Sequence, residues 1–117
     1  MLEAAGRVVM VSGASCGIGR AVVERLLASG SCVSAGVREP RGLKDGDRLL
    51  VRRYDAESVE SAESFVAATL ERFGKLDVLV NAAGINPSFG VEDADESVLD
   101  ALWAVNVKGP LRLSRLA

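Results

Sequence analysis

The sequence contains no histidine. This absence excludes Ser-His-Asp and Cys-His catalysis, and it removes the commonest metal ligand in proteins. Only two cysteines are present, Cys16 and Cys32, and their spacing does not match that of a metal site. We expect both to stay reduced, as thiols do inside cells. The sequence therefore predicts no metal centre.

Long hydrophobic runs and clustered basic residues are also missing. The early apolar run at residues 8–11 is too short for a membrane span or the core of a signal peptide. The net charge is -2, and the 14 Lys and Arg residues are scattered, so no basic field attracts a polyanion. We expect a cytoplasmic protein that has neither nucleic acid nor a membrane as a partner.

The composition is that of a folded protein. Of the 117 residues, 49% are hydrophobic and 26% are charged, which is typical of globular chains. The length matches one domain, with no linker or repeat to divide it. We expect residues 1–117 to form a single domain.

Short apolar segments alternate with amphipathic ones along the chain. The first helix is expected to pack on a sheet through the face that carries Ile18, Val22 and Leu26. Strands that are apolar on both faces and separated by helices predict a parallel α/β sheet, doubly wound in three αβα layers, with strand order 3-2-1-4 and one incomplete edge. Strands are expected at 7–12, 32–37, 49–54 and 76–80, and helices at 18–29, 57–73 and 97–117.

A glycine-rich segment joins the first strand to the first helix. Gly13 permits a tight turn, Gly17 lets backbone approach a pyrophosphate, and Gly19 lets the helix pack closely on the strand. The free N–H groups of the helix N-terminus favour phosphate. The alternative is an ordinary glycine-rich turn, and the spacing differs from the G-x-G-x-x-G of other dinucleotide-binding enzymes and methyltransferases. The candidate cofactor-binding residues here are Gly13, Ser15, Cys16, Gly17, Ile18 and Gly19.

Four residues after the fourth strand form a second candidate segment. Asn81-Ala82-Ala83-Gly84 would lie at the carboxyl edge of the sheet, beside the switch point where dinucleotides bind. Small side chains leave room for a ribose or nicotinamide ring, and we expect the Asn81 amide to tie neighbouring strands together. Taken alone, the segment also fits a plain turn at the end of a strand.

Together the two segments resemble the short-chain dehydrogenase/reductase family. The family's usual forms are T-G-x-x-x-G-x-G and N-N-A-G, and here Ser12 replaces the Thr and Ala82 the second Asn. The resemblance implies a Rossmann-type fold, a nicotinamide dinucleotide cofactor and an oxidoreductase that interconverts alcohols and carbonyls. It covers essentially the whole chain but only the nucleotide-binding half of the family.

Asn106 matches the family's catalytic asparagine, in the helix after the fourth strand. Pro110 stands four residues later and has no N–H, so the Asn106 carbonyl lacks its helical partner and is free to hold a water. In the family, that water joins a proton relay to the active-site lysine. The alternative is a kinked core helix.

Two further residues bear on the adenosine end of the cofactor. Asp55 resembles the family's acidic residue that meets the adenine ring, although it equally fits a helix cap. NAD-selective sites usually place an acidic residue at the end of the second strand, where this chain has Val37 followed by Arg38. An Arg at this place suits a 2′-phosphate, so we expect NADP(H), with NAD(H) as the alternative. Against this, Glu39 competes for Arg38, which also fits a solvated surface arginine.

The family's Tyr-x-x-x-Lys pair is missing, because the only tyrosine is Tyr54 and Ser58 stands four residues later. We therefore expect this chain to be the cofactor-binding part of a larger enzyme and to be inactive alone. One alternative is an inactive module that binds a nucleotide or a partner. Another is a methyltransferase-like domain, which the glycine spacing disfavours. The resemblance implies a small carbonyl or alcohol substrate and a homo-oligomer when full length.

Overall fold

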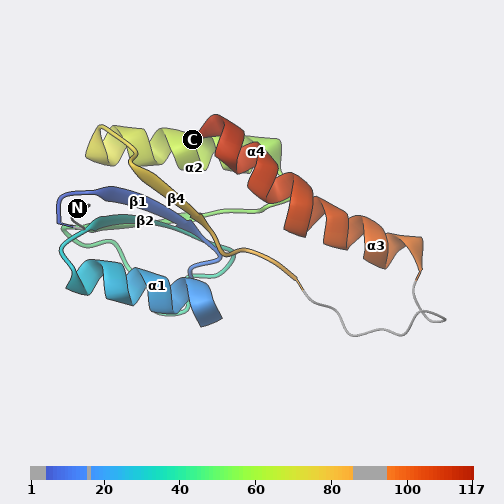
Figure 1. Cartoon of the computed structure of the whole chain (residues 1–117), viewed down its shortest axis with the longest axis horizontal. Helices are drawn as coiled ribbons and strands as arrows, with labels where there is room; N and C mark the ends of the chain where they lie inside the picture. The colour runs from blue at the N-terminus through green and yellow to red at the C-terminus, as the bar shows by residue number, and fades with distance from the viewer. Residues whose placement is uncertain (1–4, 16, 86–94) are drawn as a thin grey trace.

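The short hydrophobic segments form a sheet, and the amphipathic segments form helices that cover both of its faces (Figure 1). The computed structural model describes residues 5–15, 17–85 and 95–117. The strands are β1 (Val8–Ser12), β2 (Cys32–Val37), β3 (Leu49–Arg53) and β4 (Val78–Asn81). The helices are α1 (Gly17–Ala28), α2 (Val59–Phe73), α3 (Glu96–Trp103), the π-helix η1 (Ala104–Lys108) and α4 (Gly109–Leu116).

The four strands are parallel and stand in the order β3-β2-β1-β4. This confirms the predicted order and the three-layer α/β architecture, with α1 on one face of the sheet and α2 and α4 on the other (Figure 1). The chain moves outward from β1 to β2 and β3, and then returns to place β4 on the other side of β1. This switch point is where open parallel sheets bind ligands, beyond the carboxyl ends of the strands.

The core consists of two clusters, one on each face of the sheet. Successive residues of a strand face opposite sides, so Val9 and Val11 pack with Val23 of α1, while Met10 packs with Phe65 of α2. Gly36 of β2 makes room for the Phe65 ring. A Cβ at Gly36 would lie 2.6 Å from that ring.

The predicted face of α1 is wrong at its start. Ile18 is 79% exposed, whereas Gly19 and Val23 are buried. A Cβ at Gly19 would lie 2.0 Å from the Gly13 carbonyl oxygen. The helix therefore meets the β1 turn at Gly19, and this contact rotates Ile18 away from the sheet toward solvent.

The predicted final helix is not a continuous α-helix. The π-helix η1 interrupts it, and the Gly109 N–H donates to the Ala104 carbonyl five residues earlier. Pro110 cannot donate to Asn106, so a wider turn here replaces the α-helical pairing. α3 extends past the sheet on the N-terminal side of this turn (Figure 1).

Across the described residues, no helix combines the length and hydrophobicity that a membrane crossing requires.

Candidate functional site

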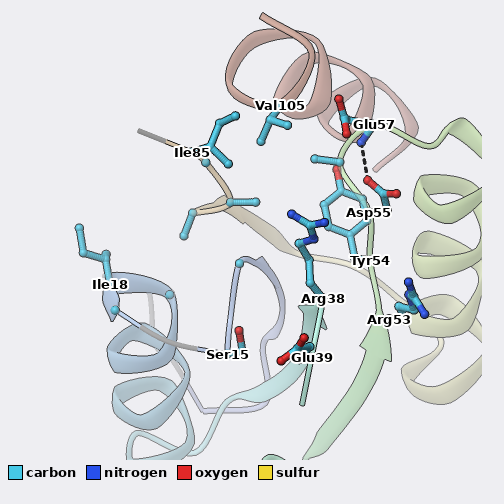
Figure 2. Close-up of a pocket in the computed structure, with 18 of the residues that line it drawn as sticks. Ser15, Ile18, Arg38, Glu39, Arg53, Tyr54, Asp55, Glu57, Ile85 and Val105 are labelled. Atoms are coloured by element: carbon cyan, nitrogen blue, oxygen red, sulfur yellow. Dashed lines mark hydrogen bonds between the residues drawn. The ribbon is translucent and has the colours of Figure 1, made fainter. Parts of the chain in front are cut away.

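A pocket of about 700 Å³ opens where the carboxyl ends of β1, β2 and β4 meet (Figure 2). Its volume lies in the range of small-molecule sites, about 300 to 1,000 Å³. Most of the predicted cofactor-binding residues contribute to its wall. These are Gly13, Ser15, Gly17, Ile18, Gly19, Arg38, Asp55, Ala82, Ala83 and Gly84.

The glycine loop is built by close backbone contacts. Gly13 has a φ of +66°, and a Cβ there would lie 2.6 Å from the Ala83 backbone. Gly17 also has a positive φ, +61°, but a Cβ there would meet nothing within 4 Å. Gly13 is therefore required for packing, while Gly17 leaves its side of the pocket open.

Ser12 joins the glycine loop to the segment after β4. Its buried hydroxyl oxygen accepts hydrogen bonds from the Ala82 N–H at 3.2 Å and the Ala83 N–H at 3.3 Å. From the sequence, Ser12 is only a departure from the family motif and is not among the predicted site residues. Its place in that motif, directly before Gly13, was the signal.

The Asn81 amide does not tie neighbouring strands together, as the sequence had suggested. Its amide nitrogen donates to the Ser114 hydroxyl at 3.1 Å, so it ties β4 to α4 rather than to a neighbouring strand. It is also absent from the pocket wall. Asn81 is the last residue of an edge strand, which leaves its side chain exposed beside the helix.

The Asn106 side chain holds the segment after β4 in place. Its Oδ1 accepts the Ile85 N–H and its Nδ2 donates to the Ile85 carbonyl, both at 2.8 Å. Asn106 lies in η1 and is not part of the pocket wall, but its neighbour Val105 and its partner Ile85 are. The side chain therefore links the π-turn to the pocket, a contact that the sequence analysis did not predict.

Asn106→Ala is expected to raise hydrogen exchange at the Ile85 amide, because both hydrogen bonds are lost. Each such bond contributes about 1 kcal/mol, so the loss of both, about 2 kcal/mol, should make the segment open about thirtyfold more often. Asn106→Asp is the matched control, since Oδ1 can still accept from Ile85. Native-state exchange followed by NMR measures both variants. Equal protection of Ile85 in Asn106→Ala and the unsubstituted protein would contradict the assignment.

Arg38 extends from the end of β2 toward Tyr54 (Figure 2). Within the described residues, neither Arg38 nor Glu39 has a hydrogen bond or ion pair through its side chain, so Glu39 does not hold Arg38. Arg41 and Arg53 also line the pocket. The pocket wall near the ends of β2 and β3 therefore carries three guanidinium groups, together with the carboxylates of Glu39, Asp55 and Glu57.

Asp55 lines the pocket just after β3 and is not the cap of α2. Its Oδ1 accepts the Glu57 N–H at 2.9 Å (Figure 2). The cap is Ser58, whose hydroxyl accepts the Ser61 N–H. The cap therefore falls on Ser58, and the adenine contact of Asp55 stays a prediction. Cys16, also predicted to lie at the cofactor, is outside the described residues.

Tyr54 is only 4% exposed and packs against Phe65, with 5.4 Å between the ring centroids. Burial raises the pKa of the Tyr54 hydroxyl, Arg112 partly opposes this, and Asp55 adds to it. This tyrosine is thus a core residue at the edge of the pocket.

Over the described part of the chain, no three His, Cys, Asp or Glu side chains are grouped to hold a metal ion.

Comparison with known proteins shows which family the chain resembles. Residues 7–117 match the family model described as short chain dehydrogenase. The chain is 34% identical over 121 residues to dehydrogenase/reductase SDR family member 4 of Caenorhabditis elegans, covering 95% of this chain and 46% of that protein. It is 35% identical over 115 residues to agropine synthesis reductase of Rhizobium rhizogenes, covering 93% of this chain and 27% of that one.

Solved structures agree with the fold. A short-chain dehydrogenase from Streptomyces avermitilis superposes with a TM-score of 0.89 at 35% identity, over 96% of this chain and 43% of that one. Aldohexose dehydrogenase of Thermoplasma acidophilum superposes with a TM-score of 0.88 at 28% identity, over 97% of this chain and 44% of that one. The chain thus spans less than half the length of these relatives. It belongs to the short-chain dehydrogenase/reductase family of oxidoreductases.

Proposed function

We propose that the pocket binds a nicotinamide dinucleotide. The observation that carries this proposal is the meeting of the glycine loop, the end of β2 and the segment after β4 around one pocket at the switch point of the sheet. The residues fit the ligand, because the open space at Gly17 lets a pyrophosphate approach the backbone at the start of α1. The proposed binding residues are the predicted ones that line the pocket, together with Cys16.

We further propose that the whole protein interconverts an alcohol and a carbonyl in a small molecule. When bound, the nicotinamide ring supplies or accepts the hydride. The small residues Ala82, Ala83 and Gly84 leave room for that ring, and Asn106 holds the adjoining Ile85 in place. Asn106 is proposed to act through its backbone carbonyl, which the missing N–H of Pro110 leaves without its helical partner.

NADP(H) is the proposed form of the cofactor. The last residue of β2 is the buried Val37 and not an acidic residue, and the acidic residue that follows in the pocket wall is Glu39, two positions later. Arg38 follows Val37, lines the pocket and is not paired with Glu39. Its fork of donors suits a 2′-phosphate.

Arg38→Ala is expected to weaken NADP⁺ binding about tenfold to hundredfold, because charge-assisted hydrogen bonds to a phosphate contribute roughly 1.5 to 3 kcal/mol. NAD⁺ has no 2′-phosphate, so its affinity should change little. Titration calorimetry with both dinucleotides measures the two effects. Arg25→Ala, on the exposed side of α1, is the matched control. Equal affinities for the two dinucleotides in the unsubstituted protein would show that Arg38 does not select NADP⁺.

The full-length protein is proposed to be a homo-oligomer. Four exposed apolar side chains, spaced four residues apart, run along α3, η1 and α4: Leu99, Trp103, Val107 and Leu111. An apolar stripe of this length on a soluble protein favours association. The mass in solution, measured by light scattering, tests this proposal.

A further inference from the structure

Arg20 connects two segments of the pocket wall without lining the pocket itself. Its Nη1 donates to the Ser15 carbonyl at 3.2 Å and to the Arg41 carbonyl at 2.7 Å. Its Nε faces the Glu24 carboxylate at 3.5 Å, one turn further along α1. Ser15 belongs to the glycine loop and Arg41 to the β2–β3 connection, and both line the pocket. One side chain of α1 therefore ties the loop to the connection.

The connection makes a strained turn at the point that Arg20 contacts. The Leu43 N–H donates to the Pro40 carbonyl at 2.9 Å, which closes the turn over Arg41 and Gly42. Arg41 has a φ of +47° and is the one non-glycine residue with a positive φ among those described. A left-handed residue with a side chain costs roughly 1 to 2 kcal/mol, so its surroundings must hold it. Arg20 bonds the carbonyl of this residue.

The far end of the connection is held by other residues. Arg48 donates to the Leu27 and Ser31 carbonyls, and Arg72 donates to the Gly46 and Asp47 carbonyls. Between residues 38 and 44, Arg20 is the one described side chain of another element that hydrogen-bonds the connection. Removal of Arg20 should therefore free the stretch next to Arg38 while leaving the far end fixed.

We propose that Arg20 is a positioning residue for cofactor selectivity. It holds the segment 38–42 at a fixed distance from the glycine loop, and this keeps Arg38 in position to bind a 2′-phosphate. This rests on the proposed NADP(H) preference. Arg20 touches no nucleotide in this scheme. The planar guanidinium of Arg20 donates to the two carbonyls through Nη1 and faces Glu24 through Nε. The single ammonium group of a lysine reproduces this arrangement only in part.

The test compares Arg20→Met, which keeps the apolar stem but loses the donors and the charge, with Arg20→Lys, which keeps the charge. Arg25→Met is the matched control, since Arg25 is an exposed arginine on the same helix and is not part of the pocket wall. Two quantities are measured on the protein as its gene encodes it. The first is hydrogen exchange at the Leu43 amide without ligand, and the second is the affinity for NADP⁺ and for NAD⁺ by titration calorimetry.

Arg20→Met is expected to raise Leu43 exchange and to lower NADP⁺ affinity by about tenfold each, the equivalent of one lost charge-assisted hydrogen bond. NAD⁺ affinity should fall by less than about threefold, because NAD⁺ has no 2′-phosphate for Arg38 to bind. Arg20→Lys should give values between those of Arg20→Met and the unsubstituted protein in both measurements. If Arg20→Met does not fold, Arg20→Lys is used for the test. Arg25→Met should match the unsubstituted protein.

Unchanged Leu43 exchange in Arg20→Met would overturn the proposal, because the connection would then be held without Arg20. Faster exchange with an unchanged ratio of the two affinities would overturn it as well, because the held segment would not set selectivity. Equal affinities for NADP⁺ and NAD⁺ in the unsubstituted protein would instead overturn the proposed cofactor preference. Leu43 exchange would in that case still decide whether Arg20 restrains the connection.

Discussion

Gly13→Ala is expected to destabilise the fold by about 2 to 5 kcal/mol. A left-handed alanine costs roughly 1 to 2 kcal/mol, and forced overpacking costs about 1 to 3 more. The overpacking arises because the new Cβ would lie 2.6 Å from the Cα and N of Ala83. These are backbone atoms of the segment that Ser12 holds, so they cannot move aside as a flexible side chain would. Urea unfolding measures the loss.

Gly17→Ala is the matched control, since it makes the same substitution in the same loop at a similar φ, +61° against +66°. A Cβ at Gly17 meets nothing within 4 Å, so only the left-handed cost of about 1 to 2 kcal/mol applies. Its effect should fall instead on nucleotide binding. If both variants lost the same stability, packing against Ala83 would not be the reason for glycine at position 13.

A protein made of these 117 residues alone is expected to show no dehydrogenase or reductase activity above background. Positioned acid–base catalysis contributes about 10²- to 10⁴-fold to a rate, and the loss of substrate orientation adds to this. The only tyrosine, Tyr54, is buried against Phe65, and burial raises the pKa of its hydroxyl. It is therefore a packed core residue at the edge of the pocket, and burial makes its hydroxyl a weaker acid. No Lys follows it four residues later, where the family's pair would have one.

NADPH absorbance, followed with a panel of ketones and aldehydes, measures this activity. A full-length member of the family, assayed alongside, shows that the panel contains turned-over substrates. Calorimetry on the same sample separates loss of binding from loss of chemistry. Steady consumption of NADPH by the 117-residue protein would contradict the expectation. It would also mean that catalysis in this chain does not require a Tyr-x-x-x-Lys pair.

The sheet and its order could be predicted from the sequence because the pattern is local and repeated. Each strand is a short apolar segment, and right-handed crossovers leave few ways to arrange four of them. Errors occur where contacts between distant segments decide the outcome. Ile18 looks like a core residue by its helical spacing, but the contact of Gly19 with the Gly13 carbonyl turns it outward.

The residues of the pocket could be predicted because glycine and small residues mark close backbone approaches. Their side-chain partners could not. Nothing in the sequence indicates that Asn81 bonds Ser114, that Asn106 bonds Ile85, or that Arg20 reaches Arg41, because 21 to 33 residues separate each pair. Pro110 predicted that the helix would be disturbed at Asn106, but the π-turn that accommodates it depends on the packing of the whole helix.

The most direct test of the central claim, that this pocket is the dinucleotide site, is to map NADP⁺ binding by amide NMR shifts on the unsubstituted protein. Saturable shifts are expected at the glycine loop, at Arg38 and at residues 82–85, because these three segments form the pocket wall. Amides on the far side, such as those of Ala28 and Gly74, should not move. Shifts confined to α3 and α4, or no saturable shift at any amide, would contradict the claim.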